Sequence, residues 1–148
     1  MGWTNSHLHE FKVKNSSYAP IEFEVENAKN SRTVKLSKLL KEKYDHILYE
    51  YDFGDSWNHS IILEDFVSEN ENNQIPRCIG GARNCPPEDC GSMSGYRDLL
   101  QIISNPRHKE YKETITWLGG KFDPEYFDIN KTNQLLTEPD FGCIWLED

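Results

Sequence analysis

Apolar and polar residues alternate from Ile47 to Leu63, and this pattern predicts a β-hairpin. Side chains on a strand point to opposite faces in turn, so Ile47, Tyr49 and Tyr51 would share one face of the first strand. The residues 54–56, Gly-Asp-Ser, interrupt the alternation with turn-forming chemistry. We therefore expect a hairpin over about residues 46–67.

The hairpin's pairing follows from the length expected for its loop. A three-residue loop containing glycine would place Phe53 opposite Trp57 and Tyr51 opposite His59. The odd-numbered residues of both strands would then face the core. In this arrangement Asp52 points away from His59.

Other segments supply further strands and several helices. Apolar residues at helical spacing predict a long helix around residues 94–104, and capping residues favour the remaining helix boundaries. We expect strands at 7–13 and 21–25 and helices at 31–43, 94–104, 111–118 and 128–136. The predicted fold class is α+β: an antiparallel sheet with a central hairpin, packed against three or four short helices, in a single domain spanning residues 1–148.

Charge and cysteine usage narrow the classes of function. Twenty-five acidic residues against sixteen basic ones give a net charge of −9, which disfavours nucleic acid as a partner. No window resembles a membrane span or a signal peptide, so we expect a soluble, cytoplasmic protein. Its cysteines would then be reduced thiols or metal ligands.

Four blocks of sequence together resemble one protein family. They are HLHEF at 7–11, YDFGDSWNHSIILE at 51–64, CPPEDCGSMSGY at 85–96 and WLGGKFDPEYFDINKTN at 117–133. The chain resembles the root-inducing-plasmid open-reading-frame-three-like family (plasmid pRi ORF-three-like). The resemblance implies a small α+β domain and no assigned catalytic residues.

Members of this family usually begin with a further strand and helix ahead of a Gly-Trp pair, whereas here Met1 directly precedes Gly2 and Trp3. The resemblance therefore implies that this chain lacks the first strand-helix unit, either through a deletion or because an internal Met stands as the start. Its loss would expose a sheet edge, which favours a homodimer.

Acidic and aromatic side chains gather in two loops that do not follow a helical or strand pattern. One is the hairpin turn, and the other belongs to a long aperiodic segment, residues 68–93, where two prolines hold the following acids in place. We predict a non-enzymatic binding or interaction module that contacts an unidentified protein or small ligand. Its candidate surface comprises Asp52, Asp55, Trp57, Glu88 and Asp89.

Histidines support an alternative, a metal-dependent enzyme of hydrolase type. Imidazole and carboxylate groups together can bind a divalent metal or act as acid and base. The candidate metal ligands are His7, His9 and His59, with Asp52 and Asp55 beside them. A third possibility, a DNA-associated protein of mobile elements, follows from names given to some family members and conflicts with the negative charge.

Overall fold

A computed structural model describes residues 2–67 and 76–142. The chain divides into two compact units, which we treat separately. The sheet unit is His7–Asn73, and the helical unit combines Met1–Ser6 with Gln74–Asp148. The prediction of a single domain stays a prediction.

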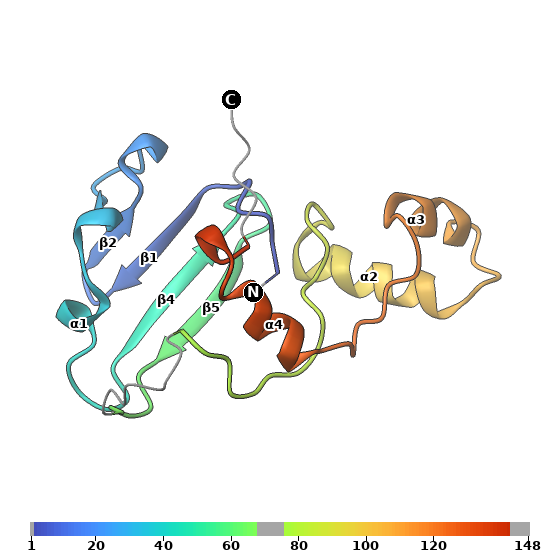
Figure 1. The fold of residues 1–148 in the computed structure, drawn as a ribbon. Coiled ribbons are helices and arrows are strands. Elements are labelled where there is room, and N and C mark those ends of the chain that lie inside the picture. The colour runs from blue at the N-terminus through green and yellow to red at the C-terminus, as the bar shows by residue number, and fades with distance from the viewer. Residues whose placement is uncertain (1, 68–75, 143–148) are drawn as a thin grey trace. The chain divides into compact units, whose positions relative to one another are not determined.

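The described residues of the sheet unit form five strands, and Figure 1 labels four of them. In chain order they are β1 (His9–Val13), β2 (Ser16–Ala19), β3 (Lys29–Asn30), β4 (His46–Tyr51) and β5 (Trp57–Ile62). Their order across the sheet is β3-β2-β1-β4-β5; β2 and β3 run parallel and all other neighbours run antiparallel. The predicted α+β class is confirmed. The hairpin β4-β5 lies at one end of this strand order, whereas the prediction placed it centrally.

The hairpin forms where predicted, but its register differs by two residues. Tyr51 pairs with Trp57 and Tyr49 with His59, because the loop has five residues, 52–56. Asp52 leaves the strand with a φ of 56° and Ser56 has a φ of 54°, so both lie in the left-handed region and turn the chain before Phe53 can pair. The predicted pairs of Phe53 with Trp57 and Tyr51 with His59 were therefore wrong.

The odd-numbered face of the hairpin is the core face, as predicted. Ile47, Tyr49, Tyr51 and Trp57 are buried. A shift of two residues keeps every side chain on its original face, because the pleat itself repeats every two residues. The error in register therefore left the burial pattern unchanged.

The strand that follows β1 begins earlier in the chain than expected. Lys14 has a φ of 52° and Val13 pairs with Ser16, so a two-residue turn leads directly into β2. The strand predicted at 21–25 is replaced by a short 3-10 helix, Ile21–Phe23, which follows Pro20. Proline has no N–H to donate to a ladder, and this ends β2.

The helix predicted at 31–43 is also shorter. A 3-10 turn, Ser31–Thr33, is followed by α1 at Leu36–Leu39. The Asp45 carboxylate accepts hydrogen bonds from the backbone N–H groups of Lys41 and Glu42, at 2.8 and 3.0 Å. Those donors would otherwise continue the helical ladder, so the helix ends early.

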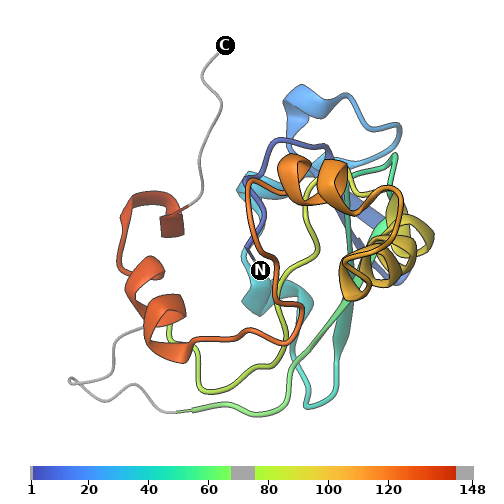
Figure 2. The ribbon, with the colours of Figure 1, turned by 90° about the vertical axis from the view of Figure 1, so that its right-hand side faces the viewer.

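The helical unit contains α2 (Ser92–Ser104), α3 (Tyr111–Trp117), α4 (Ile129–Leu135) and a 3-10 turn, Pro139–Gly142. Helices α2 and α3 pack against each other, as two views show (Figures 1 and 2). Asp128 caps α4 by accepting from the N–H groups of Asn130 and Lys131, as predicted. No helix in residues 2–67 and 76–142 has the length and apolar character needed to cross a bilayer.

Candidate functional site

The hairpin turn is organised by the Asp52 carboxylate. Its Oδ1 accepts hydrogen bonds from the N–H groups of Gly54 and Asp55, at 2.9 and 3.3 Å. The Asp52 backbone N–H donates to the carbonyl of Leu8 at 2.9 Å, and the residue is only 8% exposed. This carboxylate therefore stabilises the turn from within the sheet unit.

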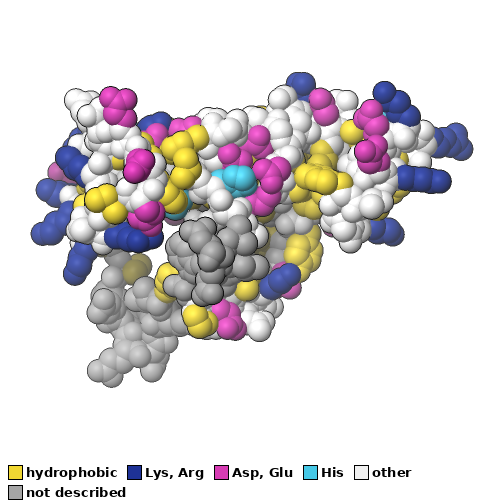
Figure 3. All heavy atoms as spheres, turned by 90° about the horizontal axis from the view of Figure 1, so that it is seen from above, with side chains coloured by type: hydrophobic (Ala, Val, Ile, Leu, Met, Phe, Trp, Pro, Cys, Tyr) yellow, Lys and Arg dark blue, Asp and Glu magenta, His cyan; other side chains and the backbone are white. Residues whose placement is uncertain are grey.

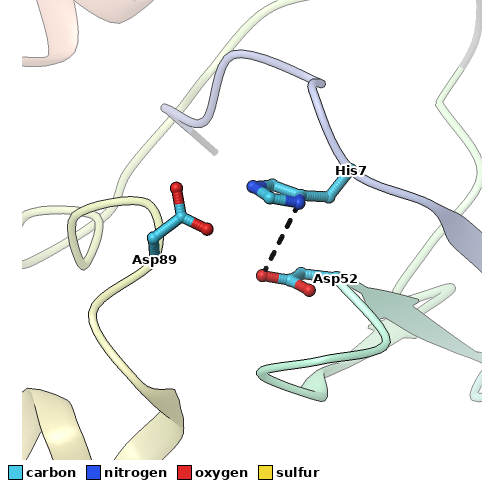
Figure 4. Close-up of side chains that lie close together, drawn as sticks. All are labelled: His7, Asp52 and Asp89. Carbon is cyan, nitrogen blue, oxygen red and sulfur yellow. Dashed lines mark ion pairs between the residues drawn. The ribbon is translucent and has the colours of Figure 1, made fainter.

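A histidine lies beside the second oxygen of this carboxylate. His7 Nδ1 is 3.9 Å from Asp52 Oδ2, and Figure 4 marks the pair with a dashed line. The His7 ring also meets the edge of Tyr51, with centroids 5.9 Å apart. An imidazole next to a carboxylate can exchange a proton or contribute two ligands to a divalent cation. Asp89, also drawn in Figure 4, belongs to the helical unit.

His9 and His59 lie on β1 and β5, with β4 between these two strands. The His9 ring contacts Phe23 at a centroid distance of 5.0 Å and Tyr49 at 5.8 Å. Burial among these rings lowers the pKa of His9, which favours the neutral form. His59 Nδ1 is 3.3 Å from the carbonyl of Tyr49. The geometry favours packing roles for both residues, and a metal role for His7, His9 and His59 stays a prediction.

The remaining two candidates in the turn differ in burial. Trp57 is 7% exposed and contributes its ring to the core of the sheet unit. Asp55 is half-buried, and its backbone N–H is one of the donors to Asp52. Of the two side chains, that of Asp55 is the better placed to meet a partner.

A charged network on the opposite face of the sheet was not predicted. Lys12 Nζ lies 2.6 Å from Glu10 Oε1 and 2.7 Å from Glu50 Oε2, and Ser56 Oγ donates to Glu50 at 2.8 Å. The Glu10 hydrogen bond is the main cause that raises the pKa of Lys12, and the Lys12 hydrogen bond is the main cause that lowers the pKa of Glu50. Glu10 faces Glu50 across β1 and β4, so the lysine offsets the repulsion of two adjacent carboxylates.

The second acidic loop is held by the N-terminal segment of the helical unit. Thr4 donates to Glu88 Oε1 twice, from its backbone N–H at 2.8 Å and from its hydroxyl at 3.0 Å. The Trp3 indole donates to the carbonyl of Pro86 at 2.8 Å. These partners are more than 80 residues apart in the sequence, so no local signal could have revealed them.

A hollow of about 500 Å³ opens beside this loop, within the helical unit. It combines two carboxylates with aromatic and aliphatic surface, and Trp117 is 52% exposed. The lining residues are Asn84, Pro87, Glu88, Asp89, Trp117, Leu118 and Phe122. Sequence analysis identified the two acids and missed the aromatic wall.

The sheet unit has a smaller hollow, of about 320 Å³, with a different charge. Lys14, Lys38 and Lys41 line it together with Glu42 and Asp45. Figure 3 shows acidic side chains interspersed with Lys and Arg on the face drawn. The basic side chains that line this hollow are exposed and mixed with acids.

Cysteines show no sign of catalytic activation in the described residues. Burial raises the pKa of the Cys85 thiol to about 12, which keeps it protonated at neutral pH. The backbone of Cys78 exchanges two hydrogen bonds with the Asn133 side chain, at 2.8 and 3.0 Å. Cys78, Cys85 and Cys90 form no disulfide among the described residues, and Cys143 lies outside them.

Comparison with known proteins agrees with the family resemblance found in the sequence. Residues 1–131 match the family described as plasmid pRiA4b ORF-3-like protein. An uncharacterized protein, y4hQ, from Sinorhizobium fredii is 30% identical over 148 residues, which cover 98% of this chain and 75% of that protein. The crystal structure of MM3350, a protein of unknown function from Methanosarcina mazei Go1, superposes with a TM-score of 0.77 at 35% identity, over 87% of this chain and 74% of that chain.

Proposed function

The chain belongs to the plasmid pRiA4b ORF-3-like family, and we propose that it is a non-enzymatic binding module whose acidic loop surface contacts a partner. The observation that carries this proposal is the carboxylate of Glu88, held by two hydrogen bonds from Thr4. A side chain already fixed before binding loses little conformational entropy when a partner arrives. Glu88 and Asp89 lie at the centre of the proposed surface, with Asp55 as a further candidate on the sheet unit.

The partner we propose is a protein or a small ligand, in the cytoplasm. The net charge of −9 argues against nucleic acid, since phosphate repels an acidic surface. A homodimer through a sheet edge is a further proposal. It is motivated by β5, which has a pairing neighbour on one side among the described strands.

Quantitative capture from a native lysate tests the binding surface. The bait is the full chain, compared with the double variant Glu88→Gln, Asp89→Asn. Glutamine retains an oxygen that can accept from Thr4, and asparagine tolerates the left-handed backbone of Asp89, whose φ is 55°. The variant should therefore stay folded and lose its specific partners.

The matched control is the double variant Asp98→Asn, Glu110→Gln. It removes two exposed acids from the same unit and changes the net charge equally. Partners captured by the control and lost from the loop variant support the proposal. Equal capture by all three baits would remove Glu88 and Asp89 from the binding surface.

A second candidate function, a metal-dependent hydrolase, is favoured by the approach of His7 Nδ1 to Asp52 Oδ2 at 3.9 Å. Elemental analysis of the purified full chain should then find stoichiometric transition metal, and His7→Ala should lose it. Asp52→Asn is the companion variant. It removes the negative charge of the carboxylate, while the amide oxygen can still accept the hydrogen bonds of the turn. Absence of stoichiometric metal from the unmodified chain would contradict this candidate.

A further inference from the structure

We propose that the smaller hollow, on the sheet unit, binds the phosphate group of a small phosphorylated molecule. The hollow has a volume of about 320 Å³, within the usual range for ligand sites, about 300–1,000 Å³. Three of the residues that line it are lysines: Lys14, Lys38 and Lys41. The proposal concerns the sheet unit alone and uses neither Glu88 nor Asp89, so it goes beyond the binding function proposed above.

One wall of the hollow is the turn between β1 and β2. Val13, the last residue of β1, contributes apolar surface, and Lys14 follows it in the turn. Ser16 and Tyr18 of β2 complete this wall. The Ser16 hydroxyl accepts a hydrogen bond from Lys29 Nζ at 3.1 Å, and the same ammonium group lies 5.6 Å from the centre of the Tyr18 ring. A fourth lysine therefore adds positive charge to this wall.

The other wall is α1 and the turn that follows it, near the end of β1 (Figure 1). Lys38 and Leu39 belong to α1, and Lys41 lies in the turn. The Asp45 carboxylate holds this turn by accepting from the N–H of Lys41 at 2.8 Å. The carbonyl of Asp45 accepts from the N–H of Leu63 at 2.9 Å, just beyond β5. The backbone that carries Lys41 is therefore fixed to the hairpin before a ligand binds.

The lysines of the hollow differ from other lysines of the sheet unit in their partners. Lys12 and Lys43 form ion pairs with carboxylates, at 2.6 and 2.9 Å. Among the residues that the structure describes, no ion pair joins Lys14, Lys38 or Lys41 to a carboxylate. Their ammonium groups are therefore available to an anion that enters the hollow.

Two acids also line the hollow, and they limit which anions it can hold. Asp45 Oδ2 accepts from the backbone N–H groups of Lys41 and Glu42, so this oxygen is directed at its own chain. The Glu42 side chain is exposed and would repel an anion. Three ammonium groups against two carboxylates still leave a positive excess, in a chain whose net charge is −9. This local excess favours an anion over a cation.

A phosphate monoester fits these donors better than a carboxylate does. It carries up to two negative charges near neutral pH and has three terminal oxygens. Lysine binds phosphate as a point charge with several N–H donors, and the Ser16 hydroxyl can donate as well. A carboxylate carries a single charge, so it would compensate less of the charge of the lysines. Val13, Leu39 and the Tyr18 ring can contact the organic part of the ligand.

NMR titration of the nitrogen-15-labelled full chain tests the site, with phenyl phosphate as the probe. Benzoate is the carboxylate counterpart and phenol the neutral one, and sodium chloride keeps the ionic strength constant. Phenyl phosphate should cause saturable shifts in the amide signals of Lys14, Tyr18, Lys38 and Lys41. Benzoate should bind at least about tenfold more weakly, because it has less charge and fewer oxygens.

Charge variants then locate the site. Lys14→Gln, Lys38→Gln and Lys41→Gln should each weaken binding of phenyl phosphate by about threefold or more, because each removes one ammonium group. Glu42→Gln should strengthen binding, since it removes a repulsive carboxylate. Lys112→Gln is the matched control: it removes an exposed lysine that does not line the hollow, and it should leave the affinity unchanged. Circular dichroism and thermal melting confirm that each variant is folded.

Three results would overturn the inference. Equal binding of benzoate and phenyl phosphate would show that the hollow does not recognise phosphate. Unchanged affinity in all three folded lysine variants would place the phosphate elsewhere. Sedimentation of the chain with vesicles that contain phosphatidic acid, without any shift caused by phenyl phosphate, would assign the phosphate to a lipid headgroup. Lysate capture with the Glu88 and Asp89 variant is a separate experiment, so the binding function proposed above stands or falls independently.

Discussion

The two acidic loops differ in how deeply their aspartates are buried. Asp52 turns its carboxylate toward the N–H groups of Gly54 and Asp55 and is 8% exposed. Asp89 is exposed and lines a hollow opposite Trp117. Both residues adopt a left-handed backbone, with φ values of 56° and 55°. Local conformation therefore does not separate a buried acid that supports a turn from an exposed acid; burial and neighbours do.

The two tryptophans near these loops also differ in how much of their surface is exposed. Trp57, which ends the hairpin turn, is 7% exposed and pairs with Tyr51, whereas Trp117 is 52% exposed. Large apolar area contributes to folding when it is buried and remains available for binding when it is exposed. If burial separates the two tryptophans in this way, replacing each of them by alanine should affect different properties of the protein.

The largest expected effect is on stability at Trp57. Trp57→Ala should lower the free energy of unfolding by about 3–5 kcal/mol, because it removes a buried ring and leaves a cavity. Trp117→Ala should change that free energy by no more than about 0.5 kcal/mol. Urea unfolding followed by circular dichroism measures both. Similar losses for the two variants would break the contrast between the loops.

A smaller effect is expected at Asp52. Asp52→Ala should cost about 1–3 kcal/mol, because two N–H groups lose their acceptor and alanine disfavours the left-handed backbone. Asp52→Asn should cost less than half as much, since its amide oxygen can accept the same bonds and asparagine tolerates that conformation. Thermal unfolding in parallel compares them. An asparagine variant as unstable as the alanine variant would mean that the negative charge itself stabilises the turn.

The smallest expected effect concerns how the free energy of unfolding changes as the pH falls. The pKa of Glu50 is held below its ordinary value by Lys12 and Ser56, so its ionised form stabilises the folded state. This contribution is complete above the pKa of the unfolded chain, about 4.3, and is lost as the pH falls through the lower folded pKa. Urea titrations between about pH 6 and pH 3 should therefore show a smaller decrease in the free energy of unfolding for Glu50→Gln than for the unmodified chain.

Asp98→Asn is the control for this pH series, because Asp98 is an exposed acid on α2, outside the Glu50 network. It should retain the steeper acid loss of the unmodified chain. Superimposable pH profiles for the unmodified chain and Glu50→Gln would show that the Glu50 network contributes nothing to acid stability.

Some features of the protein were determined by local sequence alone. The alternation from Ile47 to Tyr51 specified a strand and its buried face, and the spacing of Tyr96, Leu99 and Ile103 specified α2, in which Leu99 is buried. Asp128 was recognisable as a helix cap. Each of these depends on a repeat or a contact within a few residues, which a single sequence displays directly.

Tertiary structure decided the rest. The hairpin register escaped prediction because pairings that differ by two residues bury the same faces, and the choice fell to the left-handed backbone at Asp52. The bonds from Thr4 to Glu88, and the hollow that brings Trp117 to the acidic loop, join residues far apart along the chain. Sequence could name candidate acids for a binding surface, but which carboxylate is buried in a turn and which is exposed to solvent is a property of the folded chain.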